Sequence, residues 1–174
     1  SHSVTSMSAD QLRGDLAIEA VKSAVEKGYQ VAVVDGGSST EFRKTLSALG
    51  VRLIDQEEGG MSGSRRQAFR EAAAFSGVDA ICWTEPEKIS MVEHLGQAVK
   101  PILEGWADIV IPTRTEKSYK TYPEQQAKSE QRANHLFSEV LRLTGLLPKD
   151  SPDFDTFFGP RIFRNDPEII QLFT

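Results

Sequence analysis

The feature that most constrains the fold is an apolar run that stops abruptly at a carboxylate and two glycines. Residues 30–39 read Gln-Val-Ala-Val-Val-Asp-Gly-Gly-Ser-Ser. An unbroken run rich in β-branched residues and bounded by turn residues predicts a strand buried on both faces, as in a parallel sheet. In open α/β sheets ligands bind beyond the carboxyl ends of the strands, where Asp35, Gly36 and Gly37 would lie. We therefore expect this turn to form one end of a binding site.

Helical periodicity alternates with short apolar runs along the rest of the chain. The predicted helices cover residues 8–28, 38–50, 62–75, 89–103 and 124–143, with a last short helix from 165. The predicted strands cover residues 30–34, 51–54, 78–83, 107–111 and 161–163, and residues 112–123 are expected to form a loop over an active site. This order implies right-handed βαβ units. We expect an α/β fold with a mainly parallel, mixed central sheet covered by helices on both faces, and residues 1–174 as a single domain.

Charge and composition exclude several classes of protein. The net charge of −5 argues against a nucleic-acid partner, because that affinity depends on clustered Lys and Arg. The single cysteine, Cys82, lies in an apolar run and cannot form a disulfide framework. No apolar stretch approaches the length of a membrane span, so we expect a cytoplasmic protein. Ser1-His2 is compatible with a remnant of tag cleavage, in which case the natural N-terminus would lie upstream.

Several common catalytic signatures are absent from the sequence. It contains no G-x-G-x-x-G, no G-x-x-x-x-G-K-[ST] and no G-x-S-x-G. These absences argue against a Rossmann dehydrogenase, a P-loop NTPase and a serine hydrolase. His2, His94 and His135 have no spacing typical of a metal site or a triad, so surface or packing roles are expected for them.

Five motifs occur in the order in which one known family carries them. They are Val33–Glu41, Gly60 with Ser64–Phe69, Trp106–Arg114, Arg132–Phe137, and Asp155-x-x-x-Gly159-x-Arg161-x-Phe163-Arg164. Together they resemble the family-2 inverting glycosyltransferases, which have the GT-A fold, and the last two are similar to the dolichol-phosphate mannosyltransferase subgroup. The resemblance implies transfer of a sugar from a UDP- or GDP-linked donor to an acceptor that the motifs do not identify.

The resemblance also implies donor-binding residues. Asp35, with Gly36 and Gly37, would accept hydrogen bonds from the base or ribose, although a carboxylate there can equally cap the next helix. Arg65 or Arg66 would face the diphosphate from a helix start, with a solvated surface pair as the alternative. The remaining donor-binding candidates are Thr84, Arg161 and Arg164; packing of the two arginine stems against phenylalanine is the alternative for the last two.

The metal motif of the family corresponds to Thr84-Glu85-Pro86-Glu87 here. A divalent cation prefers oxygen ligands, so Glu85, or less favourably Glu87, would hold Mn²⁺ or Mg²⁺ against the donor phosphates. Thr84 and Glu87 also have the spacing of a capping box for the following helix. Lys88 would neutralise phosphate without a metal, or remain solvated.

Two aspartates are candidates for the general base. Asp155 matches the family's late aspartate, and Asp153 is its rival; either would take the proton of an acceptor hydroxyl, and both also suit a turn. A lipid-phosphate acceptor would need no base.

Departures from the family pattern keep a second function open. Gly36 stands where the family has a second aspartate, and residues 2–7, the counterpart of the family's first strand, are too polar for a central strand. The alternative function is therefore a catalytically silent GT-A-like domain that binds a nucleotide or a protein. A sugar-phosphate nucleotidyltransferase is a weaker possibility, because its glycine-rich, lysine-containing start is not found.

Overall fold

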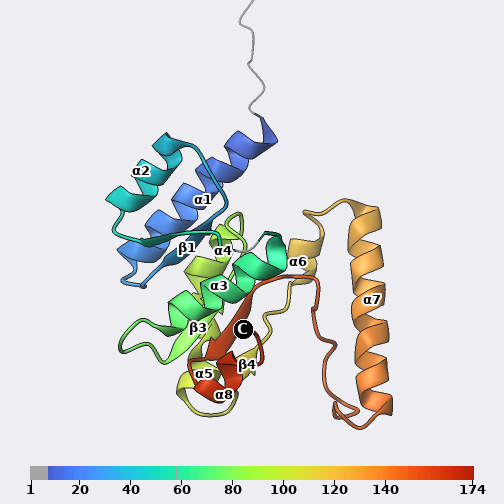
Figure 1. Ribbon diagram of the computed structural model, residues 1–174. Helices are drawn as coiled ribbons and strands as arrows, with labels where there is room; N and C mark the ends of the chain where they lie inside the picture. Colours follow the sequence, from blue (N-terminus) through green and yellow to red (C-terminus); the bar gives the residue numbers. More distant parts are fainter. Residues whose placement is uncertain (1–7, 58) are drawn as a thin grey trace, which may run out of the picture.

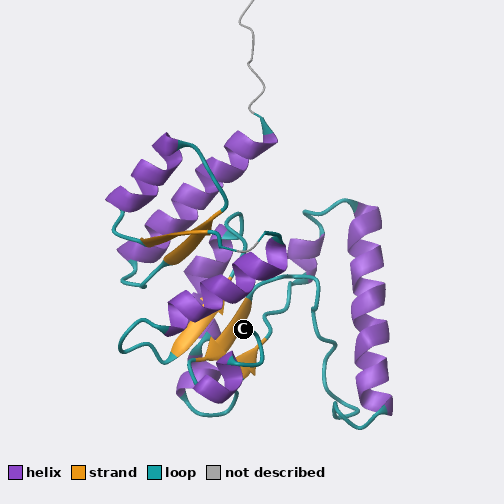
Figure 2. Ribbon diagram, in the orientation of Figure 1, coloured by secondary structure: helices purple, strands orange, loops and turns teal. Residues whose placement is uncertain are grey.

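The computed structural model describes residues 8–57 and 59–174 (Figure 1). Helices and strands alternate over much of the chain, as Figure 2 shows. The helices are α1 (Ala9–Glu26), α2 (Thr40–Ala48), α3 (Met61–Ala73), α4 (Ile89–Ala98), α5 (Lys100–Leu103), α6 (Glu116–Tyr119), α7 (Glu124–Leu143) and α8 (Pro167–Ile170). The strands are β1 (Ala32–Asp35), β2 (Arg52–Asp55), β3 (Ala80–Trp83), β4 (Ile109–Val110) and β5 (Arg161–Arg164).

The described strands form two small sheets rather than the one mainly parallel, mixed sheet that the sequence predicts. β1 pairs with β2 in parallel, and Asp35 lies opposite Asp55 at the end of the pair. β5 lies between β3 and β4 and runs antiparallel to both. Apolar runs locate strands but do not state their partners or directions. Here the last strand returns from α7 in the opposite direction, and no described strand joins β1 to β3.

The core surrounds the three-stranded sheet. On one face Phe69 of α3 and Ile170 of α8 pack with Ile81 and Phe163. The rings of Phe69 and Phe163 meet edge to face with centroids 4.8 Å apart. Met91 of α4, Ile102 of α5 and Ile162 of β5 fill the other face. Burial on both faces explains why the central positions of β3 and β5 are apolar.

Some predicted element boundaries are confirmed and others are wrong. α7 has the predicted bounds, and Ser8 caps α1 by accepting a hydrogen bond from the Gln11 N–H at 3.1 Å. The predicted loop 112–123 contains α6, which Thr115 caps. The capping box of Thr84 and Glu87 does not form, because α4 begins only at Ile89 and has no side-chain cap.

α7 lies apart from the two sheets in both ribbon views, and the chain that follows it returns along the helix to β5 (Figures 1 and 2). None of the helices among the described residues is both long enough and apolar enough to cross a membrane.

Candidate functional site

The carboxyl end of β3 and the amino end of β5 meet at the centre of the candidate site. Trp83 lies opposite Arg161 in the antiparallel register. Glu85, two residues beyond Trp83, therefore faces Gly159, two residues before Arg161. Gly159 has φ +92°, and a Cβ on it would lie 2.2 Å from Glu85 Oε1. This turn requires glycine for its backbone conformation and for the close approach of the carboxylate.

Glu85 carries an unusual oxygen. Its Oε2 is buried and has no hydrogen-bond partner among the described residues. An unpaired buried carboxylate oxygen costs free energy unless a donor or a cation satisfies it. Glu85 also lines one end of a cavity of about 680 Å³, together with Arg65, Trp83, Thr84 and Pro86.

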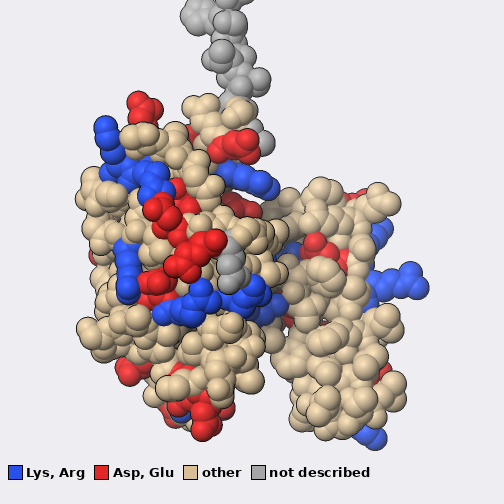
Figure 3. Space-filling model, viewed as in Figure 1, with Lys and Arg blue, Asp and Glu red and all other residues tan. Residues whose placement is uncertain are grey.

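Two guanidinium groups lie close to Glu85. Arg161 is half-buried and donates to the carbonyl oxygens of Pro160 (2.7 Å) and Thr156 (2.9 Å). Burial lowers the pKa of Arg161, and the charge of Arg65 lowers it further against the opposing effects of Asp155 and Glu85. Arg65, from the second turn of α3, stacks over the Trp83 ring at 4.3 Å. Figure 3 shows Lys and Arg side chains gathered over the part of the surface that α3 occupies in Figure 1, beside acidic ones.

Asp35 ends β1 as predicted and is buried. Both of its carboxylate oxygens lie 3.2 Å from the Ser38 N–H, and Oδ2 also accepts a hydrogen bond from Arg43. Burial raises the pKa of Asp35, but the hydrogen bonds from Ser38 and Arg43 outweigh it, so the pKa lies below its ordinary value. Arg43 also contacts Asp55 at 2.7 Å, which ties α2 to the ends of both parallel strands. The helix cap is Ser39, not Asp35.

The two positions after Asp35 favour glycine for different structural reasons. A Cβ on Gly36 would lie 2.6 Å from Gln56 Oε1, and Gly37 has φ +104°. The side chain that the family carries at position 36 would therefore displace Gln56 in this chain.

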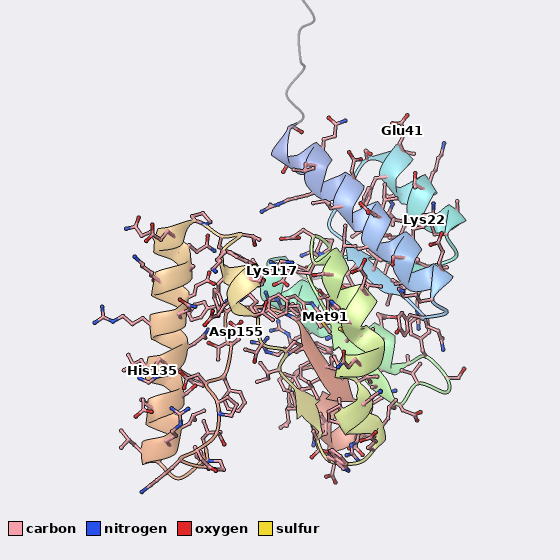
Figure 4. The ribbon with its side chains drawn as sticks, turned by 180° about the vertical axis from the view of Figure 1, so that it is seen from behind. Lys22, Glu41, Met91, Lys117, His135 and Asp155 are labelled. Carbon is pink, nitrogen blue, oxygen red and sulfur yellow. The ribbon has the colours of Figure 1, made fainter. Side chains whose placement is uncertain are left out.

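Asp155 lies in a closed polar cluster between α6 and α7 (Figure 4). Its Oδ2 accepts from the backbone N–H of Arg114 (3.0 Å) and from Nε (2.8 Å), and its Oδ1 accepts from Arg114 Nη2 (2.8 Å) and from Asn134 Nδ2 (2.9 Å). Both side chains of the ion pair are 1% exposed. Burial raises the pKa of Asp155, but the hydrogen bonds from Arg114 outweigh it and the pKa is lowered. These four hydrogen bonds use the carboxylate's acceptor sites within the protein.

Asp153, the other candidate for the general base, interacts with side chains of α7 instead. It accepts from Arg142 Nη2 at 2.7 Å and contacts His135 Nδ1 at 3.0 Å, and both partners lie on α7. The hydrogen bond from Arg142 lowers the pKa of Asp153. Figure 4 places His135 along α7, on the side of the molecule away from α1 and α2.

Lys88 is held beside the Asp155 cluster. Its Nζ donates to the Tyr122 hydroxyl at 3.1 Å and lies 5.9 Å from the centre of the Phe158 ring. Arg114 stacks over Tyr119 at 4.3 Å and over Tyr122 at 5.0 Å. These rings join α6 and the 155–159 loop around two cations.

The structure brings some of the predicted donor residues together and separates others. Arg65, Thr84, Glu85 and Arg161 meet at the end of β3. Arg164 pairs with Ala80 at the opposite end of β3 and forms an ion pair with Asp108 at 3.0 Å, so it cannot share a ligand with Arg161. Further candidates lie at the margins: Arg66 lines a shallow groove with Arg65, Leu172 and Phe173, and Glu87 is exposed.

The sequence profile described as glycosyl transferase family 2 matches residues 13–167, which is most of the chain. The chain belongs to glycosyltransferase family 2. Comparisons with curated proteins and with solved structures gave no match. Family 2 implies a GT-A-like α/β fold and the use of nucleotide-sugar donors, and it supports glycosyl transfer as the function.

A metal in this family 2 site would depend on few protein ligands. The described residues contain no group of three or more His, Cys, Asp or Glu side chains that is suited to a metal ion. A cation that bridges donor phosphates needs only one or two carboxylates. The unpaired Oε2 of Glu85 fits such a cation, whereas the exposed Glu87 has no comparable setting.

Sequence reasoning missed the partners that hold Asp155. Arg114 and Asn134 each lie inside a family 2 motif, but a motif does not indicate that the two side chains meet on one carboxylate. The sequence signal was that three collinear motifs contain polar residues, namely Arg114, Asn134 and Asp155. Because buried polar residues need hydrogen-bond partners, these three could have been expected to pair.

Proposed function

We propose that the protein is a family 2 glycosyltransferase that moves a sugar from a nucleoside-diphosphate donor to an acceptor hydroxyl with inversion. The observation that carries this proposal is the unpaired oxygen of Glu85, set against Gly159 at the mouth of a cavity and beside Arg65 and Arg161. A carboxylate with one buried oxygen, near two guanidinium groups, can bind a cation and a diphosphate together.

The donor would lie across the carboxyl ends of β1 and β3. Arg65 and Arg161 supply positive charge for the diphosphate, and Arg161 is already oriented by two backbone carbonyls. The base or ribose would approach the turn after Asp35, where Gly37 has nothing within 4 Å of its Cβ position. We retain UDP and GDP as candidate nucleotides of the donor, and we retain the resemblance to the dolichol-phosphate mannosyltransferase subgroup as a proposal.

In the transfer step the acceptor oxygen attacks the anomeric carbon as the bond from that carbon to the donor phosphate breaks. The electron pair of the broken bond leaves with the nucleoside diphosphate, which Arg65 and Arg161 stabilise electrostatically. Bound Mn²⁺ or Mg²⁺ would neutralise the diphosphate further, with Glu85 as its protein ligand.

We propose that Asp155 positions the acceptor side rather than accepting the proton. Its acceptor sites are used by Arg114 and Asn134, and its lowered pKa makes it a weak base. Asp153 is engaged by Arg142 and His135 on α7. We propose that the proton of the acceptor hydroxyl passes to solvent water, because both aspartates are engaged in their present hydrogen bonds.

A catalytically silent, nucleotide-binding domain is the second candidate. It is favoured by the ion pairs that Asp35 and Asp155 both form with arginines of the same chain. Both functions predict donor binding, and only the enzyme predicts turnover.

Titration calorimetry with a panel of UDP- and GDP-sugars, with and without Mn²⁺, tests the proposal. We expect one donor class to bind more tightly with Mn²⁺, and we expect Glu85→Gln to lose most of that gain. Glu87→Gln is the matched control, because Glu87 is exposed on the same loop and should leave binding unchanged.

The outcomes separate the two candidates. Donor hydrolysis that Glu85→Gln abolishes supports the enzyme. Donor binding without hydrolysis or transfer supports the silent domain. Failure of every donor to bind the folded protein would overturn both.

A further inference from the structure

The outer face of α7 carries a stripe of exposed apolar side chains. Leu136, Val140 and Leu143 follow one another at helical spacing, so they lie on one face of the helix. Phe137 borders them, and Leu146 follows just beyond the end of the helix. These five residues, which we call the α7 stripe, are between 47% and 83% exposed. Each of the other described helices has at most one large apolar side chain that is exposed.

The residues that α7 buries against the rest of the protein are small or polar. They are Ala127, Asn134 and Ser138. Asn134 Nδ2 donates to Asp155 Oδ1 at 2.9 Å, and Ser138 Oγ accepts from the Phe154 N–H at 2.9 Å. At 3.6 residues per turn, this buried face points about 150° away from the helical residues of the α7 stripe. A surface helix ordinarily turns its apolar face toward the core, so the orientation of α7 indicates a further surface that covers the stripe.

The exposed area of the stripe is large for a single copy. If a fully exposed large apolar residue presents about 180 Å², the stripe exposes roughly 600 Å² in each copy. The largest apolar patch on a typical monomer is about 300–600 Å² and is often functional. Two copies that cover one another's stripes would bury roughly 1,200 Å² in total, which reaches the size of a specific, stable interface.

The charges along α7 favour a protein partner over a lipid surface. The helix contains three acidic side chains and three Lys or Arg side chains, and two of these pairs are ion pairs within the helix. A helix that lies on a membrane is instead rich in Lys and Arg along its polar face. The net charge of −5 on the whole chain would also oppose an anionic membrane surface. On the face drawn in Figure 3, few charged side chains lie over the lower, C-terminal half of α7.

The pattern of the stripe is complementary to itself. Val140 lies close to the midpoint between Leu136 and Leu143. If two α7 helices pack antiparallel about a twofold axis near Val140, Leu136 of each copy faces Leu143 of the other. The exposed Arg132 of each copy then lies near the C-terminal end of the other helix, where positive charge is stabilising. A parallel pair would place like dipole ends and like charges side by side.

We propose that the α7 stripe is the interface of a homodimer in which the two α7 helices pack antiparallel. The interface lies on the face of α7 away from Asn134, so the dimer leaves the Asp155 cluster intact; Figure 4 places Asp155 between α7 and α6. This interface is an addition to glycosyl transfer, and it does not depend on the proposed function.

Sedimentation equilibrium of the 174-residue chain, from about 1 to 200 μM, tests the proposal. We expect a monomer–dimer equilibrium that Leu143→Glu weakens by about a hundredfold or more, because each dimer would then bury two carboxylates. Leu103→Glu is the matched control: it adds the same charge at an exposed leucine of α5 and should leave dimerisation unchanged. Both leucines are exposed in the single copy, so circular dichroism should show that both variants stay folded.

Cysteine variants test the orientation of the two helices in a Cys82→Ala background. Val140→Cys should form a disulfide between copies under mild oxidation, because the two thiols meet near the twofold axis. Leu136→Cys alone should not, whereas a mixture of Leu136→Cys and Leu143→Cys chains should. Cross-linking of Leu136→Cys to itself as readily as in the mixture would overturn the antiparallel arrangement.

A folded monomer at every concentration would overturn the proposal, and so would a dimer that Leu143→Glu leaves unchanged. Vesicles of phosphatidylcholine and phosphatidylglycerol that bind the wild-type chain but not Leu143→Glu would also overturn it, because the stripe would then belong to a lipid surface. No donor or acceptor is present in these experiments, so their failure is distinct from failure of the proposed function.

Discussion

At the scale of single residues, the same type of side chain has different tasks in different settings. Asp155 is enclosed by one arginine and one asparagine, whereas Glu85 keeps a buried oxygen without a described partner. The sequence identified both positions, because both lie in or near motifs. The sequence could not indicate which of the two carboxylates is paired, because Asp155 is paired by Arg114, which lies 41 residues away in the sequence.

The buried pair gives a prediction for stability. Asp155→Asn leaves the guanidinium of Arg114 buried beside Glu130 alone, so the free energy of unfolding should fall by about 3 kcal/mol, the lower end of the range for a broken buried pair. Urea unfolding measures the change. Asp150→Asn, an exposed aspartate near the same loop, should change stability by no more than about 0.5 kcal/mol.

The same variant changes the response to acid. The pKa of Asp155 in the folded state is lowered from 3.8, so the ionised carboxylate stabilises the fold above about pH 4 and this contribution is lost as pH falls from 3.8 through the folded pKa. Wild-type protein should therefore lose more stability in this acid range than Asp155→Asn does. An identical loss in both would contradict the assignment.

At the scale of elements, register decides which candidates share a site. Arg161 and Arg164 lie three residues apart in one motif, and the sequence suggested phosphate binding for both. The antiparallel pairing of β5 with β3 places Arg161 beside Trp83 and Arg164 beside Ala80, at opposite ends. The sequence predicted a mixed sheet but not that β5 runs antiparallel to β3, because an apolar run reads the same in either direction.

The turn before β5 offers a test of its contact with Glu85. Gly159→Ala forces a Cβ toward Oε1 of Glu85 and strains a residue with φ +92°. Gly145→Ala carries similar strain at φ +75° with nothing within 4 Å, and should cost about 1–2 kcal/mol. We expect Gly159→Ala to cost more, and Glu85→Ala to recover the excess in a double-mutant cycle measured by urea unfolding. Equal costs at the two glycines would mean that the carboxylate moves away freely.

At the scale of the whole molecule, the order of helices and strands was predictable and the sheet was not. α7 has the predicted bounds, and helices cover both faces of the three-stranded sheet. Local periodicity gives these features, because it depends on residues close in sequence. The gap between β1 and β3 depends on which strands meet, and residues 2–7, the counterpart of the family's first strand, lie outside the described residues.

Hydrogen exchange should display this gap. In the chain as it stands, the amides of Ala32 and Val34 face the cavity, while that of Val33 faces β2. We expect the amide hydrogens of Ala32 and Val34 to exchange with solvent faster than that of Val33, as measured by NMR. An amide without a hydrogen-bond partner exchanges without first breaking a hydrogen bond. Uniform protection along β1 would indicate that its second edge is already paired.

The contact between Glu85 and Gly159 also constrains how this sequence can diverge. Because the carboxylate occupies the space of a side chain at 159, a residue with a Cβ at 159 requires that the Glu85 carboxylate move or that position 85 carry a shorter residue, while glycine at 159 leaves 85 free to keep its acid. In related chains we therefore expect positions 85 and 159 to vary together. Chains that lack the glycine at 159 should also lack the acidic residue at 85.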